Sequence, residues 1–519
     1  MSHTTITFLV LGAVIVVFVL DRFPVAVVAV ATALSLWATG VLELHQSLAG
    51  FGDPAVIFIA SLFVVSESLD ATGITAWAGQ LLISSVGESR SKLLIAMLLL
   101  VALLTALITV NGAVAALLPV MVVTAVRLRR PASLLLLPLA FGAHAGSLLT
   151  LTGSPVNVIA SEYLHDAGAG SFGYFSFALA GIPLVAGTVV VVLLFGDRLL
   201  PRRTARAISK DFSDHARTLV EQYMLAPDGG LLTRTSGLAE VVIPPRSPLI
   251  GDIAFPGMVT DSGDLVVVAV QRREEELSGE TVLAVGDTLL LRGPWGALEH
   301  HLDDPAVLVV DEPDLVRRQA VPLGPGAKRA LVILAVMVVL LATGAVPPAA
   351  AGLLAAGALV VSGVLSIESA YRGISWTTVI LVAGMIPLST AMVETGAAAK
   401  LADALVDVVG RTSPYALLAG LFLLTVVLGQ LISNMATALI VIPIALQAAK
   451  DLDVSARPVL MCVTVSAAAA LLTPVATPAN LMVMEPGGYR FSDYWKLGLP
   501  LLGLYGVVAV LLVPVFWSF

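Results

Sequence analysis

Two short polar stretches interrupt long apolar segments of the chain and have the residue types needed to bind ions. Residues 150–157 read TLTGSPVN, and residues 473–480 read TPVATPAN. Proline removes a backbone donor and clashes with the preceding turn, so a continuous α-helix cannot pass through either stretch unchanged. A break leaves unpaired N–H groups at one new helix end and unpaired C=O groups at the other. The N–H end favours an anion, and the C=O end offers the oxygen atoms that Na⁺ prefers.

The two stretches belong to a repeat with a constant offset of 323 residues. Asn157 and Asn480 are separated by this offset. The same offset links Asn111 to Asn434, Pro155 to Pro478, Thr72-Gly73 to Thr395-Gly396, and Gly50 to Gly373. Hydrophobic segments that are interrupted by Gly or Pro at matching places in two halves indicate the binding site of a secondary transporter.

The composition is that of a polytopic membrane protein. Of the 519 residues, 58% are hydrophobic and 12% are charged, whereas soluble proteins have about 25% charged residues. We read residues 6–20 as a first membrane span and not as a signal peptide, because no basic region or cleavage site accompanies them. The single cysteine, Cys462, excludes a disulfide within the chain. No nucleophile–base set, metal cluster or phosphate loop is visible, so we do not expect an enzyme.

Residues 197–327 form a hydrophilic insert between two transmembrane repeats, residues 1–196 and 328–519. The insert carries 13 Lys and Arg against 20 Asp and Glu. Its acidic balance gives no support for nucleic-acid binding. Five basic residues follow the span before it and predict a cytoplasmic insert by the positive-inside rule: Arg198, Arg202, Arg203, Arg206 and Lys210.

Each half is expected to have five spans, counting the broken one, and a hairpin. The expected spans are 6–20, 23–41, 54–69, 132–164 and 172–195, then 330–343, 347–364, 377–395, 458–484 and 497–516. Residues 71–89 and 397–411 are expected along the membrane surface. Because five is odd, the second half enters the membrane in the opposite direction, which gives two inverted repeats. Both termini would then lie outside the cell.

Residues 92–126 and 414–450 are too long for one span. The first is about 34 residues, or about 51 Å as one helix, against a hydrocarbon core of about 30 Å. The first segment has basic residues at both ends, so we predict a re-entrant hairpin in each half. The tips are expected at Val110-Asn111-Gly112 and at Ser433-Asn434. The alternative is a pair of short ordinary spans with the polar tip on the far surface.

Residues 236–303 of the insert predict a small α/β module. Strands are expected at 238–243, 265–270 and 288–292, and a helix at 295–302. The sequences SPLIGD, DLVVVAVQR and LAVGDTLLLRGPW resemble the TrkA C-terminal (RCK-C) regulatory domain of potassium channels and transporters. The resemblance implies dimerisation and a small regulatory ligand, and it assigns no residue to a ligand pocket.

The membrane part resembles the divalent anion–sodium symporter family. The residues that carry this resemblance are Asn111, Ser154-Pro155, Ser433-Asn434 and Thr477-Pro478. This family belongs to a superfamily that also contains citrate and arsenite transporters. The resemblance implies a homodimer and an elevator-like movement of the hairpin-bearing half. It also implies a Ser-Asn-Thr motif at each hairpin tip that touches substrate and sodium. Here both asparagines are present, but one serine and both threonines are missing.

These patterns give one candidate site. The anion is expected to contact Asn111, Ser154, Pro155, Ser433, Asn434, Thr477 and Pro478. One sodium ion is expected near Asn111 and Gly153, and another near Asn434 and Ala476. No Lys or Arg lies in this set, so helix dipoles and the sodium ions must balance the charge of the anion.

Three further residues have two readings each. Asn157 and Asn480 either cap the second half-helices or contact the ligand. Glu67 either reaches the membrane interface or acts as an intramembrane carboxylate.

The function expected from this site is sodium-coupled import of a small divalent anion, either a sulfate-like oxyanion or a dicarboxylate. Transport would follow an elevator mechanism in the cell membrane, with regulation by the insert. One alternative is a cation/proton antiporter or an oxyanion extruder, which would need a carboxylate such as Glu67 or Glu394. Another is a ligand-gated channel. The expected partners are the anion, membrane lipid and a second copy of the chain, with sodium and no organic cofactor.

Overall fold

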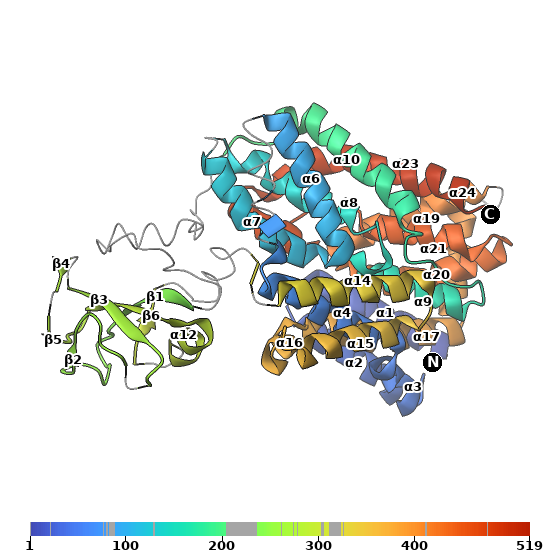
Figure 1. The fold of residues 1–519 in the computed structure, drawn as a ribbon. Coiled ribbons are helices and arrows are strands. Elements are labelled where there is room, and N and C mark those ends of the chain that lie inside the picture. Colours follow the sequence, from blue (N-terminus) through green and yellow to red (C-terminus); the bar gives the residue numbers. More distant parts are fainter. Residues whose placement is uncertain are drawn as a thin grey trace. The chain divides into compact units, whose positions relative to one another are not determined.

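The chain folds into two compact units, a large helical unit and a smaller unit that contains the insert (Figure 1). The computed structural model describes residues 2–20, 22–75, 77–78, 81, 89–127, 130–203, 236–260, 262–272, 275–277, 279–302, 306–310, 323–324, 326–409, 413–474 and 476–519. Arg206, Lys210 and much of the expected surface stretch 71–89 lie outside these residues.

The first half of the helical unit contains two hairpin-forming helices and one broken helix. Its helices are α1 (His3–Leu20), α2 (Val25–Ala38), α3 (Leu44–Leu48), α4 (Pro54–Ala71), α6 (Arg90–Leu107), α7 (Val110–Arg127), α8 (Leu136–Gly146), α9 (Pro155–Asp166) and α10 (Ala178–Leu199). Short 3₁₀ turns cover Ala49–Gly52, Ala132–Leu134 and Leu151–Gly153. Helices α6 and α10 lie side by side and both pack against α8.

The second half repeats this order. Its helices are α14 (Ala327–Thr343), α15 (Pro348–Val361), α16 (Ile367–Gly373), α17 (Trp376–Glu394), α18 (Ala397–Val409), α19 (Pro414–Leu431), α20 (Asn434–Asp451), α21 (Ala456–Ala467), α22 (Pro478–Met484), α23 (Tyr494–Val507) and α24 (Val513–Phe516). A π-helical turn over Val508–Leu512 joins α23 to α24. Long helices α4 and α17 both end before a glycine with φ of +71°, Gly73 and Gly396, the backbone conformation that favours glycine after a helix.

The helices have the character expected of a membrane protein. Among the described residues, six helical segments are long and apolar enough to cross a bilayer. They are Leu44–Ala71, Arg90–Leu107, Ala178–Leu199, Trp376–Glu394, Pro414–Leu431 and Phe491–Phe516. Two other helices form the interior. Every residue of α8 is buried, and α20 is buried along most of its length. The expectation of a polytopic helical membrane protein is confirmed.

The insert contains an antiparallel sheet with strand order β4-β3-β6-β1-β7. The strands are β1 (Ser236–Val242), β3 (Val266–Arg272), β4 (Glu275–Glu276), β6 (Thr288–Pro294) and β7 (Leu308–Val309), while β2 (Ile253–Ala254) pairs with β5 (Thr281–Val282) separately. Helix α12 (Trp295–Leu302) follows β6, and Trp295 and Leu298 join a core with Val241 and Leu291. A Cβ at Gly237 would lie 2.2 Å from the Trp295 ring, so glycine is required there.

An ion pair between the buried Asp287 and the exposed Arg272 makes the stability of the insert depend on pH. Asp287 accepts hydrogen bonds from Arg272 Nε at 2.7 Å, Arg272 Nη2 at 2.6 Å and Ala284 N at 2.7 Å. The Arg272 hydrogen bonds hold the pKa of Asp287 below its usual value. A lowered pKa in the folded state stabilises the fold above the usual Asp pKa, and this stabilisation is lost as the pH falls through the lowered pKa.

We therefore expect backbone hydrogen exchange in β6 of the full chain to accelerate, after correction for intrinsic rates, between about pH 5 and about pH 3. The Asp287→Asn variant should exchange faster at neutral pH and show a flatter pH dependence. An unchanged slope in this variant would show that another group is responsible.

Candidate functional site

One cavity brings together all nine residues that the sequence predicts for the anion and the two sodium ions. Its volume is about 260 Å³. Its lining includes Asn111, Gly153, Ser154, Pro155, Ser433, Asn434, Ala476, Thr477 and Pro478. These residues come from both halves of the chain and from two hairpins and two broken helices. Glu67 does not line it and lies instead on α4 beside Gly373.

The hairpin tips are two-residue breaks between helices. Ile108 and Ile432 are both extended, with φ of −127° and −131°. The next residues, Thr109 and Ser433, accept hydrogen bonds from backbone N–H groups three residues ahead, each at 3.3 Å. This is the geometry of helix N-caps.

The first tip therefore lies at Ile108-Thr109, and the prediction of a turn at Val110-Asn111-Gly112 is wrong. Gly112 is helical and Asn111 lies in the first turn of α7, because the Thr109 hydroxyl caps the helix earlier than an Asn-Gly turn would. The equivalent cap residues, Thr109 and Ser433, are 324 residues apart, whereas Asn111 and Asn434 are 323 residues apart. The two asparagines therefore occupy helix positions that differ by one residue in the structure.

Both Pro-containing stretches break their helices. Helix α8 ends at Gly146 and α9 begins at Pro155, while α21 ends at Ala467 and α22 begins at Pro478. Ser154 caps α9 by accepting from Val156 N at 3.2 Å. Thr477 caps α22 by accepting from Asn480 N at 3.3 Å.

Asn157 and Asn480 have a structural role that differs from the predicted capping. The Asn157 Nδ2 donates to the carbonyls of Ser147 and Thr150, both at 2.8 Å. The Asn480 Nδ2 donates to the carbonyls of Ala470 and Thr473, at 2.7 and 3.0 Å. Each buried amide thus crosses the break and donates to two backbone carbonyls of the interrupted segment, of which Thr150 O also accepts from Gly153 N.

Asn434 presents an oxygen that the protein leaves unsatisfied. Its Oδ1 is buried and has no hydrogen-bond partner among the described residues, although the residue lines the cavity. Leaving a buried acceptor unpaired costs about 1–3 kcal/mol. Such an oxygen is well suited to coordinate a hard cation, since Na⁺ takes oxygen ligands.

The polarity of the cavity comes from dipoles and hydroxyl groups. None of the described residues lining it is Lys, Arg, Asp or Glu. Among the described residues, five helices begin at its wall, with Val25 of α2, Val110 of α7, Pro155 of α9, Asn434 of α20 and Pro478 of α22. Helix N-termini carry partial positive charge and unpaired N–H groups. The arrangement can therefore hold an anion without a cationic side chain.

Sequence reasoning missed six polar residues of the cavity wall: Thr109, His144, Ser147, Thr377, Thr378 and Thr464. The search relied on positions that recur at the 323-residue offset. His144 corresponds to Ala467 at this offset, so the repeat gave no signal for it. Its position ten residues before the Ser154-Pro155 break was the available clue.

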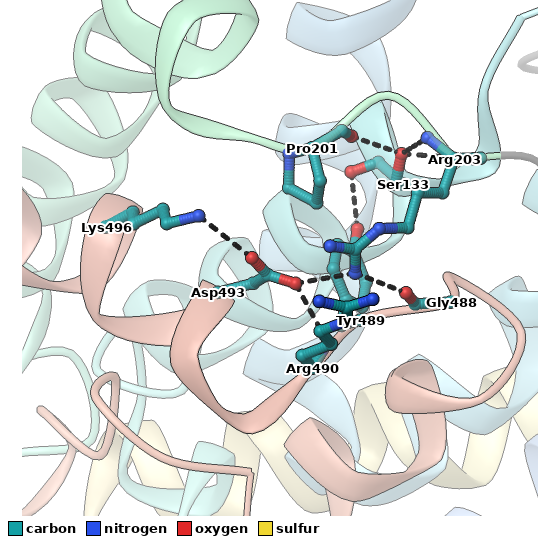
Figure 2. Close-up of polar contacts among 8 residues, drawn as sticks. All are labelled: Ser133, Pro201, Arg203, Gly488, Tyr489, Arg490, Asp493 and Lys496. Carbon is teal, nitrogen blue, oxygen red and sulfur yellow. Dashed lines mark hydrogen bonds and ion pairs between the residues drawn. The ribbon is translucent and has the colours of Figure 1, made fainter.

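A polar cluster fixes the segments that flank the broken helices (Figure 2). Tyr489 Oη donates to Ser133 O at 2.5 Å and accepts from Leu137 N at 2.8 Å, which anchors the start of α8. Tyr494 Oη donates to Asn480 O at 2.6 Å. Arg203 Nη1 donates to Gly488 O at 2.6 Å. These bonds join the ends of α8, α10 and α23 and so position His144 and Asn480.

Asp493 is the centre of this cluster. Its side chain is 2% exposed, and it pairs with Arg203 at 2.7 Å and with Lys496 at 3.0 Å (Figure 2). It also accepts from Arg490 N at 2.8 Å. The two basic side chains remain partly exposed, which weakens the pairs relative to a fully buried one.

Asp493→Asn is expected to lower the free energy of unfolding by about 2 kcal/mol, because Arg203 and Lys496 lose their counter-charge. Thermal unfolding of the purified protein in detergent measures this loss. The matched control is Glu368→Gln, since the Glu368–Arg372 pair is exposed and should contribute little. Equal shifts of the unfolding temperature in the two variants would contradict a larger stabilising contribution from the Asp493 cluster.

The two carboxylates that a cation/proton antiporter could use, Glu67 and Glu394, do not line the cavity of the predicted ligand residues. Glu394 accepts a hydrogen bond from Gln46 Nε2 at 3.2 Å. It lines a separate cavity of about 520 Å³ together with Asp53, Glu162 and Asp166. Neither Glu67 nor Glu394 contributes to the cavity that holds the predicted ligand residues.

The sequence is similar to two uncharacterised transporters along nearly its whole length and to a sodium/sulfate cotransporter over half of it. The model of the citrate transporter family, CitMHS, matches residues 15–453 and 409–519. The Escherichia coli protein described as uncharacterized transporter YfbS is 30% identical over 98% of both chains. The Synechocystis protein described as uncharacterized transporter sll0640 is 26% identical over 99% of this chain and 97% of its own. Sodium/sulfate cotransporter 1 of Chlamydomonas reinhardtii is 26% identical over 50% of this chain and 32% of its own.

Proposed function

Because the chain belongs to the citrate transporter family, we propose that it imports a small divalent anion together with Na⁺. The protein is a membrane transporter of this family, and its relatives include a protein named for sodium and sulfate. The proposed cargo is a sulfate-like oxyanion or a small dicarboxylate. The cell membrane is the proposed location, with the insert in the cytoplasm and both termini outside.

The observation that carries this proposal is the single cavity shared by the two hairpin tips and the two helix breaks. The anion would lie between the tips, where it would accept from backbone N–H groups at the starts of α7 and α20 and from the hydroxyls of Ser154, Ser433 and Thr477. Helix N-termini are established anion sites. A volume of about 260 Å³ accommodates a small anion.

The proposed sodium ions would occupy the oxygen-rich sides of this cavity. One ion would bind near Asn111 and Gly153, and the other near Asn434 and Ala476. The unpartnered Asn434 Oδ1 supports the second position. Bound sodium would also reduce the charge of the anion, since no basic side chain among the described lining residues does so. The need for bound sodium to balance the charge of the anion is the physical basis of the proposed coupling between anion and sodium transport.

The mechanism we propose is an elevator-like movement within a homodimer. The two halves would be inverted repeats with re-entrant hairpins, as their matching helix order suggests. The hairpins pack on the broken helices, α7 against α8 and α22, and α20 against α9 and α21. This packing would let the site move as one body. The insert, through its resemblance to TrkA-C domains, is the proposed regulatory element for a small ligand.

Uptake into proteoliposomes tests the function. Radiolabelled sulfate, succinate and citrate are each presented with an inward sodium gradient, and potassium replaces sodium in the control. We expect saturable uptake of at least one anion that requires sodium. Uptake that does not saturate would indicate a channel. Absence of sodium dependence for every transported anion would contradict symport.

A further inference from the structure

His144 is a buried imidazole in the wall of the cavity. It is 2% exposed and lies near the end of α8, whose residues are all buried. Its Nε2 is 3.2 Å from Asn480 Oδ1 and 3.2 Å from Thr477 Oγ1. It is the only titratable residue among the described residues of the wall. The charged residues of the helices that pack on α8 lie at helix ends, namely Arg90, Lys92, Arg127, Asp197 and Arg198.

The hydrogen bonds of Asn480 determine which imidazole nitrogen carries a proton. The Nδ2 of Asn480 faces two backbone carbonyls, which can only accept. The other amide atom, Oδ1, must therefore be the oxygen that faces His144, and an amide oxygen can only accept. Nε2 of His144 consequently carries a hydrogen, in the neutral ring as well as in the cation.

This assignment fixes the direction of the Thr477 hydroxyl. Thr477 Oγ1 receives Asn480 N–H and shares the Nε2–H of His144 as a three-centre bond. Both contacts use the lone pairs of the hydroxyl oxygen. Its own hydrogen cannot point to His144, because Nε2 has no lone pair to offer. The Thr477 hydrogen is thus left for an acceptor in the cavity that Thr477 lines.

The other half of the chain lacks this arrangement. At the 323-residue offset, His144 corresponds to Ala467, which has no polar side chain and also lines the cavity. Asn157 corresponds to Asn480, and its Oδ1 is buried without a hydrogen-bond partner among the described residues. The two repeats therefore present different chemistry to the same cavity.

We propose that His144 is a positioning residue that holds the Thr477 hydroxyl as a hydrogen-bond donor to the transported anion. The site then selects anions that present an unprotonated oxygen to Thr477. This inference rests on the proposed function, since it concerns the anion of that site. It adds a specificity-determining pair, His144 and Thr477, to the residues expected from the repeat.

Four variants test the inference by sodium-dependent uptake of whichever of sulfate, succinate and citrate the wild type transports. His144→Gln keeps an N–H donor near the Nε2 position, so KM should stay within about threefold of wild type. His144→Met removes the donor and should raise KM about tenfold or more, the effect of losing one hydrogen bond to a charged group. Thr477→Val should raise KM similarly.

The combination His144→Met with Thr477→Val distinguishes positioning from an independent contact. If His144 acts through Thr477, the double variant should have the KM of Thr477→Val alone. Multiplicative increases would overturn the inference, as would equal KM values for the Gln and Met variants. Should the Met variant fail to fold, judged by size-exclusion chromatography, His144→Asn replaces it, because its shorter amide cannot reach Thr477.

The outcomes also separate this inference from the proposed function. Wild-type protein that takes up none of the three anions with sodium would overturn the proposed function and the inference with it. Wild-type uptake together with an unchanged KM in Thr477→Val would overturn the inference alone.

Discussion

Replacing Asn434 with alanine is expected to lower sodium-dependent anion uptake about 100-fold while the protein remains folded, since a lost bond to an ion costs up to about 3 kcal/mol. The Asn434 Oδ1 makes no hydrogen bond with any described residue, so its removal breaks no hydrogen bond of this oxygen within the described residues. Thermal stability should be unchanged or slightly higher. Initial uptake rates and thermal unfolding of the same preparation measure the two effects.

Thr437→Val is the matched control for this variant. Thr437 lies one turn further along α20, and its Oγ1 is also buried without a partner among the described residues. It does not line the cavity. Its replacement should be equally harmless to the fold and should leave uptake near the wild-type rate. Near-normal uptake by Asn434→Ala, or a similar loss in both variants, would refute the assignment of Asn434 to the site.

Asn480→Leu is expected to cause a large loss of stability. Leucine has the same number of side-chain heavy atoms and the same branching, but it leaves the carbonyls of Ala470 and Thr473 without a partner. It also removes one of the two acceptors of the His144 Nε2–H, which keeps Thr477 Oγ1. At about 1–3 kcal/mol for each of the two unpaired carbonyls, the total loss is roughly 2–6 kcal/mol. The yield of monodisperse protein and its thermal unfolding temperature measure this effect.

Asn157→Leu provides the comparison within the same molecule. It removes the Nδ2 donor of the Ser147 and Thr150 carbonyls, but Thr150 O keeps its bond from Gly153 N and the Asn157 Oδ1 has no described partner to lose. It should therefore destabilise the protein less than Asn480→Leu does. An equal or larger loss at Asn157 would show that the number of groups left without a partner does not determine the loss.

Much of the helical unit could be predicted because its signals are local. Pro155 and Pro478 cannot continue a helix, and each is the first residue of a new helix in the structure. The length and flanking charges of residues 92–126 predicted two helices where the structure has α6 and α7. The residues of the candidate site followed from the same breaks, and one cavity contains them.

The remaining features depend on contacts that a repeat pattern does not encode. The first hairpin tip was misplaced because Asn-Gly is a stronger turn signal than the Thr109 cap that determines where α7 begins. Asn480 was expected to cap its helix, but its side chain reaches carbonyls seven and ten residues back. His144 lies 336 residues from Asn480 in the chain, and only the packing of α8 against α22 brings them together.

The most direct test of the account is equilibrium binding of radiolabelled anion to the purified protein. Sulfate, succinate and citrate are measured by scintillation proximity in sodium and in potassium buffer, with wild-type protein and with Asn434→Ala. We expect saturable binding of one anion per chain in sodium, little in potassium, and loss of sodium-dependent binding in the variant. Binding that is the same in both buffers, or the same in both proteins, would contradict a shared site for the anion and Na⁺.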